Sequence, residues 1–232
     1  MTTIASNMQA VRDAIDAAAY AAGRDPQDVA LLAVSKTFPA EDIRAAHAAG
    51  QRRFGESYVQ EAVGKISELH DLDIEWHFIG PIQSNKTRPI AENFSWVHSI
   101  ERLKIAERLS AQRPENLPPL QVCIEVNISG EASKSGVTPN EVAALAQAVV
   151  SLPRLQLRGL MAIPQPDSNP AQQHASFAQL RQLQTDLIAQ GIPLDTLSMG
   201  MSHDFPAAIA EGATLVRIGT AIFGARNYGG HL

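Results

Sequence analysis

The sequence predicts a single (β/α)8 (TIM) barrel of the α/β class, with one extra N-terminal helix and residues 1–232 in one domain. Short apolar segments alternate with Ala- and Leu-rich helical segments eight times along the chain, and this alternation implies a parallel sheet covered by helices. Eight such units in 232 residues fit a barrel near the small end of its size range. No G-x-G-x-x-G follows the first strand, which weakens the alternative of a doubly wound open sheet.

The first helix and the first unit are predicted from periodicity and stop signals. Apolar residues recur at helical spacing from Ile4 to Ile15, so this segment is an amphipathic helix rather than a secretion signal. The run VALLAV at 29–34 has the length and composition of a buried strand. The next helix, 39–49, has Pro39 in its first turn and ends at Gly50.

The remaining strands are short apolar runs, each ended by a polar or glycine-containing turn. The strand at 74–79 (IEWHFI) stops at Gly80, and the strand at 121–128 (QVCIEVNI) is the clearest in the chain. The Pro-rich stretch 114–119 is a loop rather than a domain linker, because the pattern resumes directly after it. The other predicted strands are 53–54, 96–98, 156–163, 196–198 and 215–218, and the other helices are 58–69, 84–91, 101–112, 139–150, 172–190, 204–211 and a final turn from 220.

Composition excludes several classes of function. The net charge is -5 and the basic residues are scattered, so no basic patch is available for nucleic acid. No apolar segment is long enough to cross a membrane. Cys123 is the single cysteine, so no intrachain disulfide can form. We therefore expect a cytoplasmic protein without a nucleic-acid or membrane partner.

Lys36 stands directly after the first predicted strand, at the end of the barrel where TIM barrels carry their chemistry. Burial in the barrel mouth disfavours the charged form of a lysine, and a neutral amine can form a Schiff base with an aldehyde. The structural alternative is a lysine that reaches solvent or pairs with a carboxylate such as Glu56. The position of Lys36 alone leaves both interpretations open.

Two glycine-containing segments follow the seventh and eighth predicted strands, SMGMS at 198–202 and RIGTAIFG at 217–224. Glycine lets the backbone approach a ligand closely, and the start of a helix offers free N–H groups to an anion. The loops after these two strands are the usual phosphate site of the fold. Ordinary helix capping by Ser202 and Thr220 is the alternative. Together the two segments predict a ligand that carries a phosphate.

Three inward-facing candidates need a partner inside the barrel. Arg217 lies within the eighth predicted strand, where a lone buried charge is costly, so it faces either a ligand or Glu125. His77 and His98 lie on or just past neighbouring strands without an Asp or Cys to complete a metal set, so no metal site is predicted. His77 is then a hydrogen-bonded wall residue.

Seven segments, in register over nearly the whole chain, resemble the YggS/PROSC family of pyridoxal phosphate homeostasis proteins. They are LLAVSKT (31–37), FGESYVQE (54–61), EWHFIGPIQSNK (75–86), SKSG (133–136), RGLMAI (158–163), LSMGMSHD (197–204) and VRIGTAIFGAR (216–226). The barrel of that family is similar to the N-terminal domain of alanine racemase. The resemblance implies pyridoxal 5'-phosphate (PLP) as a Schiff base on Lys36, with Arg217 facing the pyridine nitrogen. The other PLP-binding residues that it implies are Ser202, Gly219 and Thr220 at the phosphate and Ser57, His77, Met161 and Ser198 in the pocket, with Lys134 as a second contact.

Two residues depart from the family pattern. Ser57 stands where Asn is usual, which shortens or removes a contact near the cofactor ring. His203 stands where Asp is usual, at the opening of the helix after the phosphate loop, and His caps a helix more weakly than Asp.

Arginine at the pyridine nitrogen favours a carrier over an enzyme. It cannot accept the proton of that nitrogen, so it makes the ring a weaker electron sink than a carboxylate would. The racemase site is completed by a second domain and a catalytic tyrosine, for which we expect no counterpart among Tyr20, Tyr58 and Tyr228. We therefore predict a monomeric PLP carrier of intracellular PLP homeostasis without turnover, with apo PLP-dependent enzymes as candidate recipients. A small PLP-dependent racemase or decarboxylase is the alternative, and a phosphosugar-binding barrel is the third.

Overall fold

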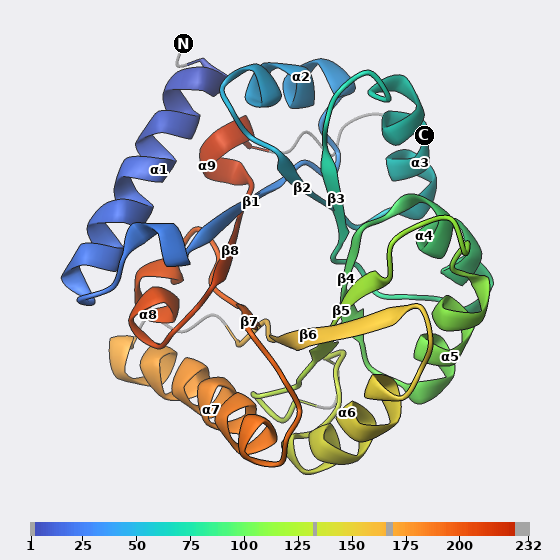
Figure 1. The fold of residues 1–232 in the computed structure, drawn as a ribbon. Helices are drawn as coiled ribbons and strands as arrows, with labels where there is room; N and C mark the ends of the chain where they lie inside the picture. Colours follow the sequence, from blue (N-terminus) through green and yellow to red (C-terminus); the bar gives the residue numbers. More distant parts are fainter. Residues whose placement is uncertain (1–2, 132–133, 166–168, 226–232) are drawn as a thin grey trace.

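Eight parallel strands form one closed barrel in the order β1 to β8, and the helices surround it (Figure 1). The computed structural model describes residues 3–131, 134–165 and 169–225. Each strand pairs with the next in the chain, and β1 closes the barrel against β8 through pairs such as Leu32 with Arg217. The predicted TIM barrel is confirmed.

The strands are β1 Ala30–Val34, β2 Arg53–Glu56, β3 Glu75–Phe78, β4 Trp96–Ile100, β5 Leu120–Glu125, β6 Leu155–Met161, β7 Thr196–Ser198 and β8 Leu215–Ile218. The α-helices of the described residues are α1 Ile4–Ala21, α2 Ala40–Ala48, α3 Val59–Glu68, α4 Thr87–Asn93, α5 Leu103–Gln112, α6 Val142–Val150, α7 Pro170–Ala189, α8 Phe205–Ala210 and α9 Thr220–Phe223. Short 3-10 turns at Pro26–Asp28, Ser84–Lys86 and Pro139–Glu141 precede β1, α4 and α6.

Helix α1 is the predicted extra helix, and it covers the place where the barrel closes. The side chain of Thr3 accepts a hydrogen bond from the N–H of Ser6, which caps the start of the helix. Apolar residues at helical spacing, from Met8 to Ala19, bury one face of α1. Asn7 Nδ2 donates to the carbonyl of Ile222 over 2.8 Å, so α1 is tied to α9 beside it (Figure 1).

The fifth strand is shorter than the sequence predicts. It ends at Glu125 rather than at residue 128, because the chain turns there and folds back over the barrel mouth. Val137 donates its N–H to the carbonyl of Glu125, and Val126 makes an isolated bridge to Val137. Gly136 lies so close to the backbone of residues 125–127 that a side chain there would collide with it. This return loop brings Lys134 to the mouth beside Glu125.

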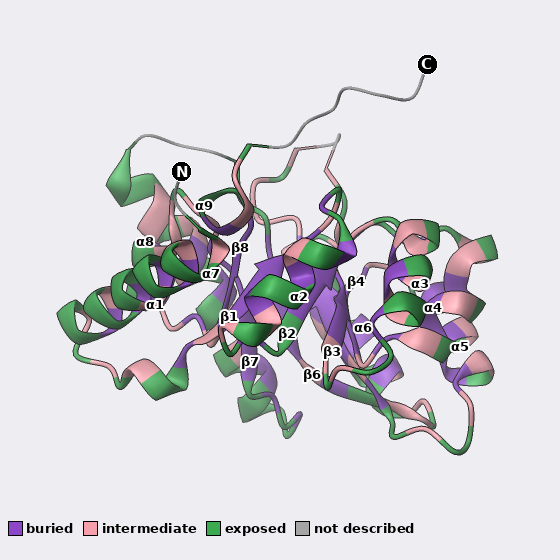
Figure 2. Cartoon of the chain, turned by 90° about the horizontal axis from the view of Figure 1, so that it is seen from above, coloured by how far each residue is buried: buried purple, intermediate pink, exposed green. Residues whose placement is uncertain are grey.

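The apolar core has two parts. Most buried apolar side chains lie between the strands and the helices, so the strands are buried and the helices expose one face (Figure 2). Inside the barrel, Trp96, Cys123 and Met161 form a separate small cluster, and burial raises the pKa of the Cys123 thiol to about 12. The rest of the interior contains buried polar side chains, which is unusual and points to a site. Within the described part of the chain, no helix is long and apolar enough to span a membrane.

Candidate cofactor site at the carboxyl end of the barrel

Lys36 follows β1 and lies half-buried beside a cavity of about 570 Å³ at the carboxyl ends of the strands. The loops after β2, β3 and β6 line this cavity with Ser57, Ile79, Pro81 and Ile163. Cavities of this size accommodate small cofactors. Lys36 and Ser57 therefore line one cavity at the mouth of the barrel.

The turn that carries Lys36 is held in a strained conformation. Thr37 has a φ of 70°, in the left-handed region that non-glycine residues rarely adopt. Its N–H donates to Glu61 Oε1 over 2.6 Å, so a residue of α3 fixes the turn from outside. Strain that the surroundings impose on a loop is typical of functional sites, and here it is adjacent to the candidate lysine.

A buried ion pair lies beneath this turn. Glu56 is fully buried, and its Oε1 accepts hydrogen bonds from Ser35 Oγ at 2.6 Å and from Lys65 Nζ at 2.8 Å. Lys65 Nζ also donates to the carbonyl of Ser35 over 2.9 Å. Burial raises the pKa of Glu56, and the charge of Lys65 opposes that shift. Glu56, which the sequence offers as a partner for Lys36, thus pairs with Lys65. Both members of this pair also hydrogen-bond Ser35, the residue that precedes Lys36.

The loops after β7 and β8 lie side by side, as a phosphate site requires. The N–H of Arg217 donates to the carbonyl of Gly200 over 2.9 Å, which joins the first loop to the eighth strand. Gly200 has a φ of 92° and packs against Ala208, so no side chain fits there. Gly219 directly precedes Thr220, the first residue of α9, whose first N–H groups have no acceptor within the helix.

The helix after the first of these loops begins one residue later than predicted. Helix α8 starts at Phe205, and its N-cap is Asp204, whose Oδ1 accepts from the N–H of Met201 over 2.6 Å. His203 is exposed within the turn. Residue 203 is therefore not the N-cap. Asp204 occupies that position, although its side chain accepts from Met201 before the helix and from no N–H of the first helical turn, so the expected weaker capping by His203 does not apply here.

Arg217 is buried, and three carbonyl or hydroxyl oxygens hold its guanidinium. Nη1 donates to the carbonyl and to the Oγ of Ser198, both over 2.7 Å, and Nη2 donates to the carbonyl of Ala162 over 2.9 Å. Burial lowers the pKa of Arg217 to about 10, so it stays charged at neutral pH. Glu125 affects Arg217 only through space, and the alternative of a direct ion pair between them is wrong.

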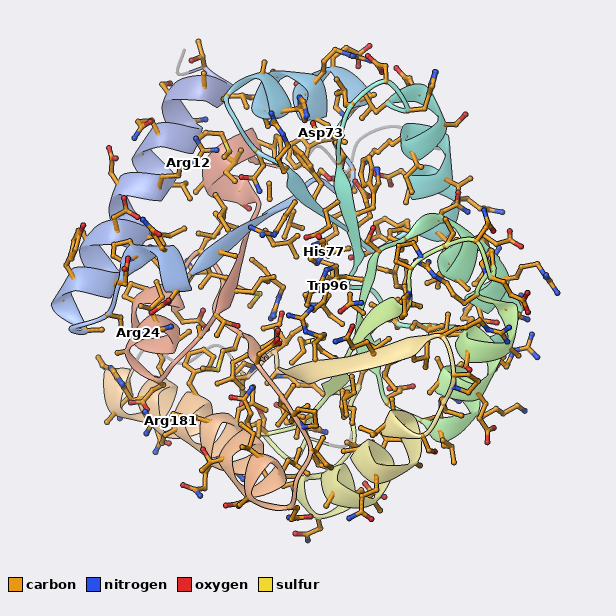
Figure 3. All side chains as sticks on the ribbon, viewed as in Figure 1. Arg12, Arg24, Asp73, His77, Trp96 and Arg181 are labelled. Atoms are coloured by element: carbon orange, nitrogen blue, oxygen red, sulfur yellow. The ribbon has the colours of Figure 1, made fainter. Side chains whose placement is uncertain are left out.

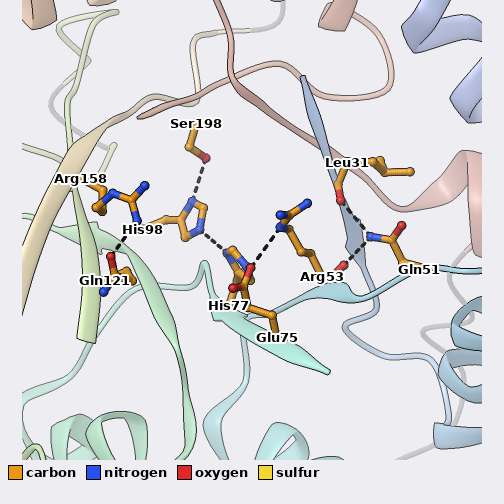
Figure 4. Close-up of polar contacts among 9 residues, drawn as sticks. All are labelled: Leu31, Gln51, Arg53, Glu75, His77, His98, Gln121, Arg158 and Ser198. Carbon is orange, nitrogen blue, oxygen red and sulfur yellow. Dashed lines mark hydrogen bonds and ion pairs between the residues drawn. The ribbon is translucent and has the colours of Figure 1, made fainter. Parts of the chain in front are cut away.

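A chain of hydrogen bonds runs from Arg217 through Ser198 and the barrel interior to the amino end of the barrel, and Figure 4 shows it from Ser198 to Glu75. Ser198 Oγ lies 2.8 Å from His98 Nδ1, His98 Nε2 lies 2.8 Å from His77 Nδ1, and His77 Nε2 lies 2.9 Å from Glu75 Oε1. Arginine only donates and an ionised carboxylate only accepts, so the two ends assign every proton between them. Ser198 donates to His98, His98 donates to His77, and His77 donates to Glu75.

Both histidines in this series of hydrogen bonds are neutral. Burial lowers the pKa of His77 below its ordinary value and lowers that of His98 well below it. The pKa of Glu75 falls to about 2, chiefly through its hydrogen bond to His77. A proton added to His77 Nδ1 would place its N–H against that of His98 Nε2, and a proton added to His98 Nδ1 would displace the hydroxyl hydrogen that Ser198 donates to it. The chain therefore has one stable arrangement of protons, and it holds Ser198 and Arg217 in one pose.

His77 does not line the cavity beside Lys36. Its ring stacks on Trp96 with centroids 5.3 Å apart, at the centre of the barrel (Figure 3). It lines a different cavity of about 530 Å³ near the amino end, together with Arg53 and Arg158. His77 is thus not among the residues that line the cavity beside Lys36, where the sequence predicts it. It is linked to Ser198 only indirectly, through its hydrogen bond with His98. No group of three metal-ligating side chains occurs among the residues that the structure describes.

Replacing His98 with Leu should destabilise the protein by about 2–4 kcal/mol, because the hydroxyl of Ser198 and Nδ1 of His77 then lose their partners while buried. The wild type should lose stability as pH falls below 6.5. His77 and His98 have lowered pKa values in the fold, so they bind protons in the unfolded chain at a pH where they stay neutral in the folded protein. The variant should lose less over that range. Urea unfolding at pH 7.5 and 5.5 measures both effects, with the exposed His70→Leu as control. A His98→Leu variant as stable as His70→Leu would contradict the chain.

Comparison with known proteins places this arrangement in a family. Residues 5–227 match the family model of the alanine racemase N-terminal domain. The pyridoxal phosphate homeostasis protein of Pseudomonas aeruginosa is 66% identical over 229 residues, covering 99% of this chain and 98% of that protein. The chain belongs to the family of pyridoxal phosphate homeostasis proteins. The Escherichia coli member of this family is 56% identical and covers 98% of this chain and 99% of its own length.

Solved structures agree with this membership in the homeostasis protein family. PipY of Synechococcus elongatus, solved with PLP bound, has a TM-score of 0.84 and 40% identity, covering 96% of this chain and all of that one. Alanine racemase of Corynebacterium glutamicum has a TM-score of 0.66 with 19% identity, covering 99% of this chain and 62% of the racemase. The second likeness concerns the fold alone.

Proposed function

We propose that this chain binds PLP as a Schiff base on Lys36 and acts as a cytoplasmic carrier in PLP homeostasis. The observation that carries the proposal is Lys36 on a strained turn, half-buried beside a cavity of about 570 Å³ at the carboxyl end of the barrel. The names of its relatives and the PLP-bound structure of PipY support the same role. Bound there, the cofactor supplies a reactive aldehyde.

The residues at the mouth fit a phosphorylated aromatic aldehyde. Gly200 leaves no room for a side chain, and Gly219 opens α9, so backbone N–H groups are free to meet a phosphate. We assign the phosphate to Ser202, Gly219 and Thr220. The guanidinium of Arg217 has five N–H groups, and its bonds to Ser198 and Ala162 use three of them. One of the remaining N–H groups would donate to the ring nitrogen. Met161, Ser198 and Ser57 would surround the ring.

A carrier needs to hold the aldehyde without driving a reaction on it. Arg217 stays charged and cannot take a proton from the ring nitrogen. Its orientation is fixed from below by Ser198 and His98, both fully buried. We infer that the site favours storage and release over turnover, that residues 1–232 act as one domain and as a monomer, and that apo PLP-dependent enzymes are the recipients.

A second candidate function is amino-acid racemisation or decarboxylation. Tyr58 lines the cavity beside Lys36 and is half exposed, so a phenol does lie near the candidate lysine. Exchange of the Cα hydrogen of L-alanine for deuterium, followed in the PLP-loaded protein, separates the two functions. The carrier predicts slow exchange that Tyr58→Phe leaves unchanged, whereas the enzyme predicts fast exchange that this variant removes.

Lys36→Ala should abolish the absorption band of bound PLP and the adduct that borohydride fixes to the protein. Lys86→Ala is the matched control, because Lys86 lines the same cavity and offers a second amine. Absorption spectra and mass mapping of the reduced peptide measure both variants. A pyridoxyl group on Lys36 in the wild type and in Lys86→Ala is the expected result. A wild type that stays colourless with added PLP, or an adduct on Lys86, would overturn the proposal.

A further inference from the structure

A second, smaller cavity adjoins the one beside Lys36. It has a volume of about 210 Å³ and lies at the end of β5, opposite β1 in the barrel. The two cavities share Ile79, Pro81 and Ile163. The two cavities therefore adjoin along these three apolar side chains.

Two hydrogen-bond acceptors in this small cavity have no donor. Glu125 is only 8% exposed, and its carboxyl receives no hydrogen bond from any residue that the structure describes. Asn127 Oδ1 is buried and also has no partner. The orientation of that amide is determined, because Asn127 Nδ2 donates to the carbonyl of Glu131 over 2.7 Å, and the reversed amide would place two oxygens together. Buried acceptors without donors are rare and costly.

The charges around Glu125 select a cation for this cavity. Glu101, on the loop after β4, adds a second negative charge, while Arg217 acts from inside the barrel. Lys134 also lines the cavity. Its Nζ lies 2.8 Å from Glu131 Oε2, which balances its charge, and it donates no hydrogen bond to Glu125 or Asn127. Burial and Glu101 raise the pKa of Glu125 to about 7, so its carboxylate can both accept and return a proton near neutral pH.

We propose that this cavity is an amine subsite, in which Glu125 and Asn127 receive the ammonium group of a primary amine, such as the α-amino group of an amino acid, next to Lys36. The proposal rests on the proposed function of Lys36. An ammonium has three donors for the two unpaired acceptors, and the apolar walls Ile79 and Ile163 accommodate a short carbon chain.

In this subsite, Glu125 takes the proton that an ammonium must lose before its nitrogen becomes a nucleophile. With PLP bound on Lys36, an amine deprotonated in this subsite would be placed to take the cofactor from Lys36, and Glu125 would hold the proton that the released Nζ takes up. The subsite thereby makes primary amines the agents that release the cofactor from the protein.

Binding of an amine to the cofactor-free protein tests the subsite without any Schiff base. L-alaninamide at pH 7 should raise the Tm of the wild type in a concentration-dependent way, and N-acetyl-L-alaninamide, which lacks the amine, should not. Glu125→Gln should lose the response, and Glu92→Gln, an exposed glutamate on α4, should keep it. Equal responses of Glu125→Gln and the wild type, or of the two amides, would overturn the subsite even if Lys36 binds PLP.

The stability of Glu125→Gln provides a readout that needs no ligand. In the wild type the folded carboxyl has a raised pKa, so its ionisation destabilises the fold above pH 7, and this effect disappears as pH falls toward 4.5. The variant should therefore unfold at higher urea than the wild type at pH 8 and at the same urea at pH 4.5. Equal midpoints at pH 8 would mean that Glu125 has a partner, and the subsite would lose its basis.

Release of the cofactor from the loaded protein tests the chemistry. With L-alanine added to PLP-loaded protein, the absorbance of the bound cofactor should decay about a hundredfold more slowly in Glu125→Gln than in the wild type, the scale of a lost general base. The affinity for PLP should be unchanged, and Glu92→Gln should match the wild type. An unchanged rate in Glu125→Gln overturns the amine subsite, whereas failure to load any protein with PLP refutes the proposed function instead.

Discussion

Gly159→Ala is expected to prevent stable folding. Gly159 lies in β6 opposite Thr196 of β7, and a Cβ at this position would overlap the carbonyl oxygen of Thr196. The colliding atom belongs to the backbone of a strand in a closed barrel, so it cannot move without breaking the pairing of β7 with β8. Overpacking that flexible side chains can absorb costs about 1–3 kcal/mol, and a backbone collision should exceed that range.

Gly64→Ala is the matched control for this prediction. Gly64 lies in α3, and a Cβ there meets no atom of another part of the chain within 4 Å. Alanine in a helix is favoured over glycine by about 1 kcal/mol, so this variant should be as stable as the wild type or slightly more. Urea unfolding followed by circular dichroism measures both variants. A Gly159→Ala protein that unfolds at the urea concentration of Gly64→Ala would show that β6 and β7 are not packed as described.

Lys65→Met is expected to cost about 3–5 kcal/mol at neutral pH, because it leaves the carboxylate of Glu56 buried without its cation. Glu56 is fully buried, and its second oxygen already has no hydrogen-bond partner. Since the pKa of Glu56 is raised in the fold, lowering the pH protonates it and removes the unpaired charge. The loss should therefore shrink as pH falls toward the ordinary range of a carboxyl group.

The double variant Lys65→Met/Glu56→Gln provides the control, because it removes both charges. It should recover most of the stability that the single variant loses, as replacement of a whole buried pair usually does. Chemical unfolding at pH 7.5 and pH 5 measures the three proteins. A single variant that loses the same stability at both pH values would show that Lys65 acts by packing and not by charge.

Much of this protein can be predicted from the sequence, because the features concerned are local. The alternation of apolar runs and helical segments depends on neighbours along the chain, and it predicts the barrel and its order of strands. Lys36 follows a strand in any such barrel, and Gly200 and Gly219 lie after the seventh and eighth strands, where the sequence places them. The family membership likewise follows from segments that can be read in order.

The partners of the inward-facing side chains follow only from the tertiary structure. His98 and Ser198 are 100 residues apart in the sequence and meet because β4 and β7 both contribute side chains to the interior of one closed barrel. From the sequence, Glu56 is a possible partner of Lys36, and Glu125 is a possible partner of Arg217. In the fold, Glu56 pairs with Lys65 instead, and Glu125 receives no hydrogen bond from a described residue. Such pairings depend on how far each strand is shifted against the next and on side-chain rotamers. A sequence pattern shows that a residue points inward, but only the closed barrel decides what it meets there.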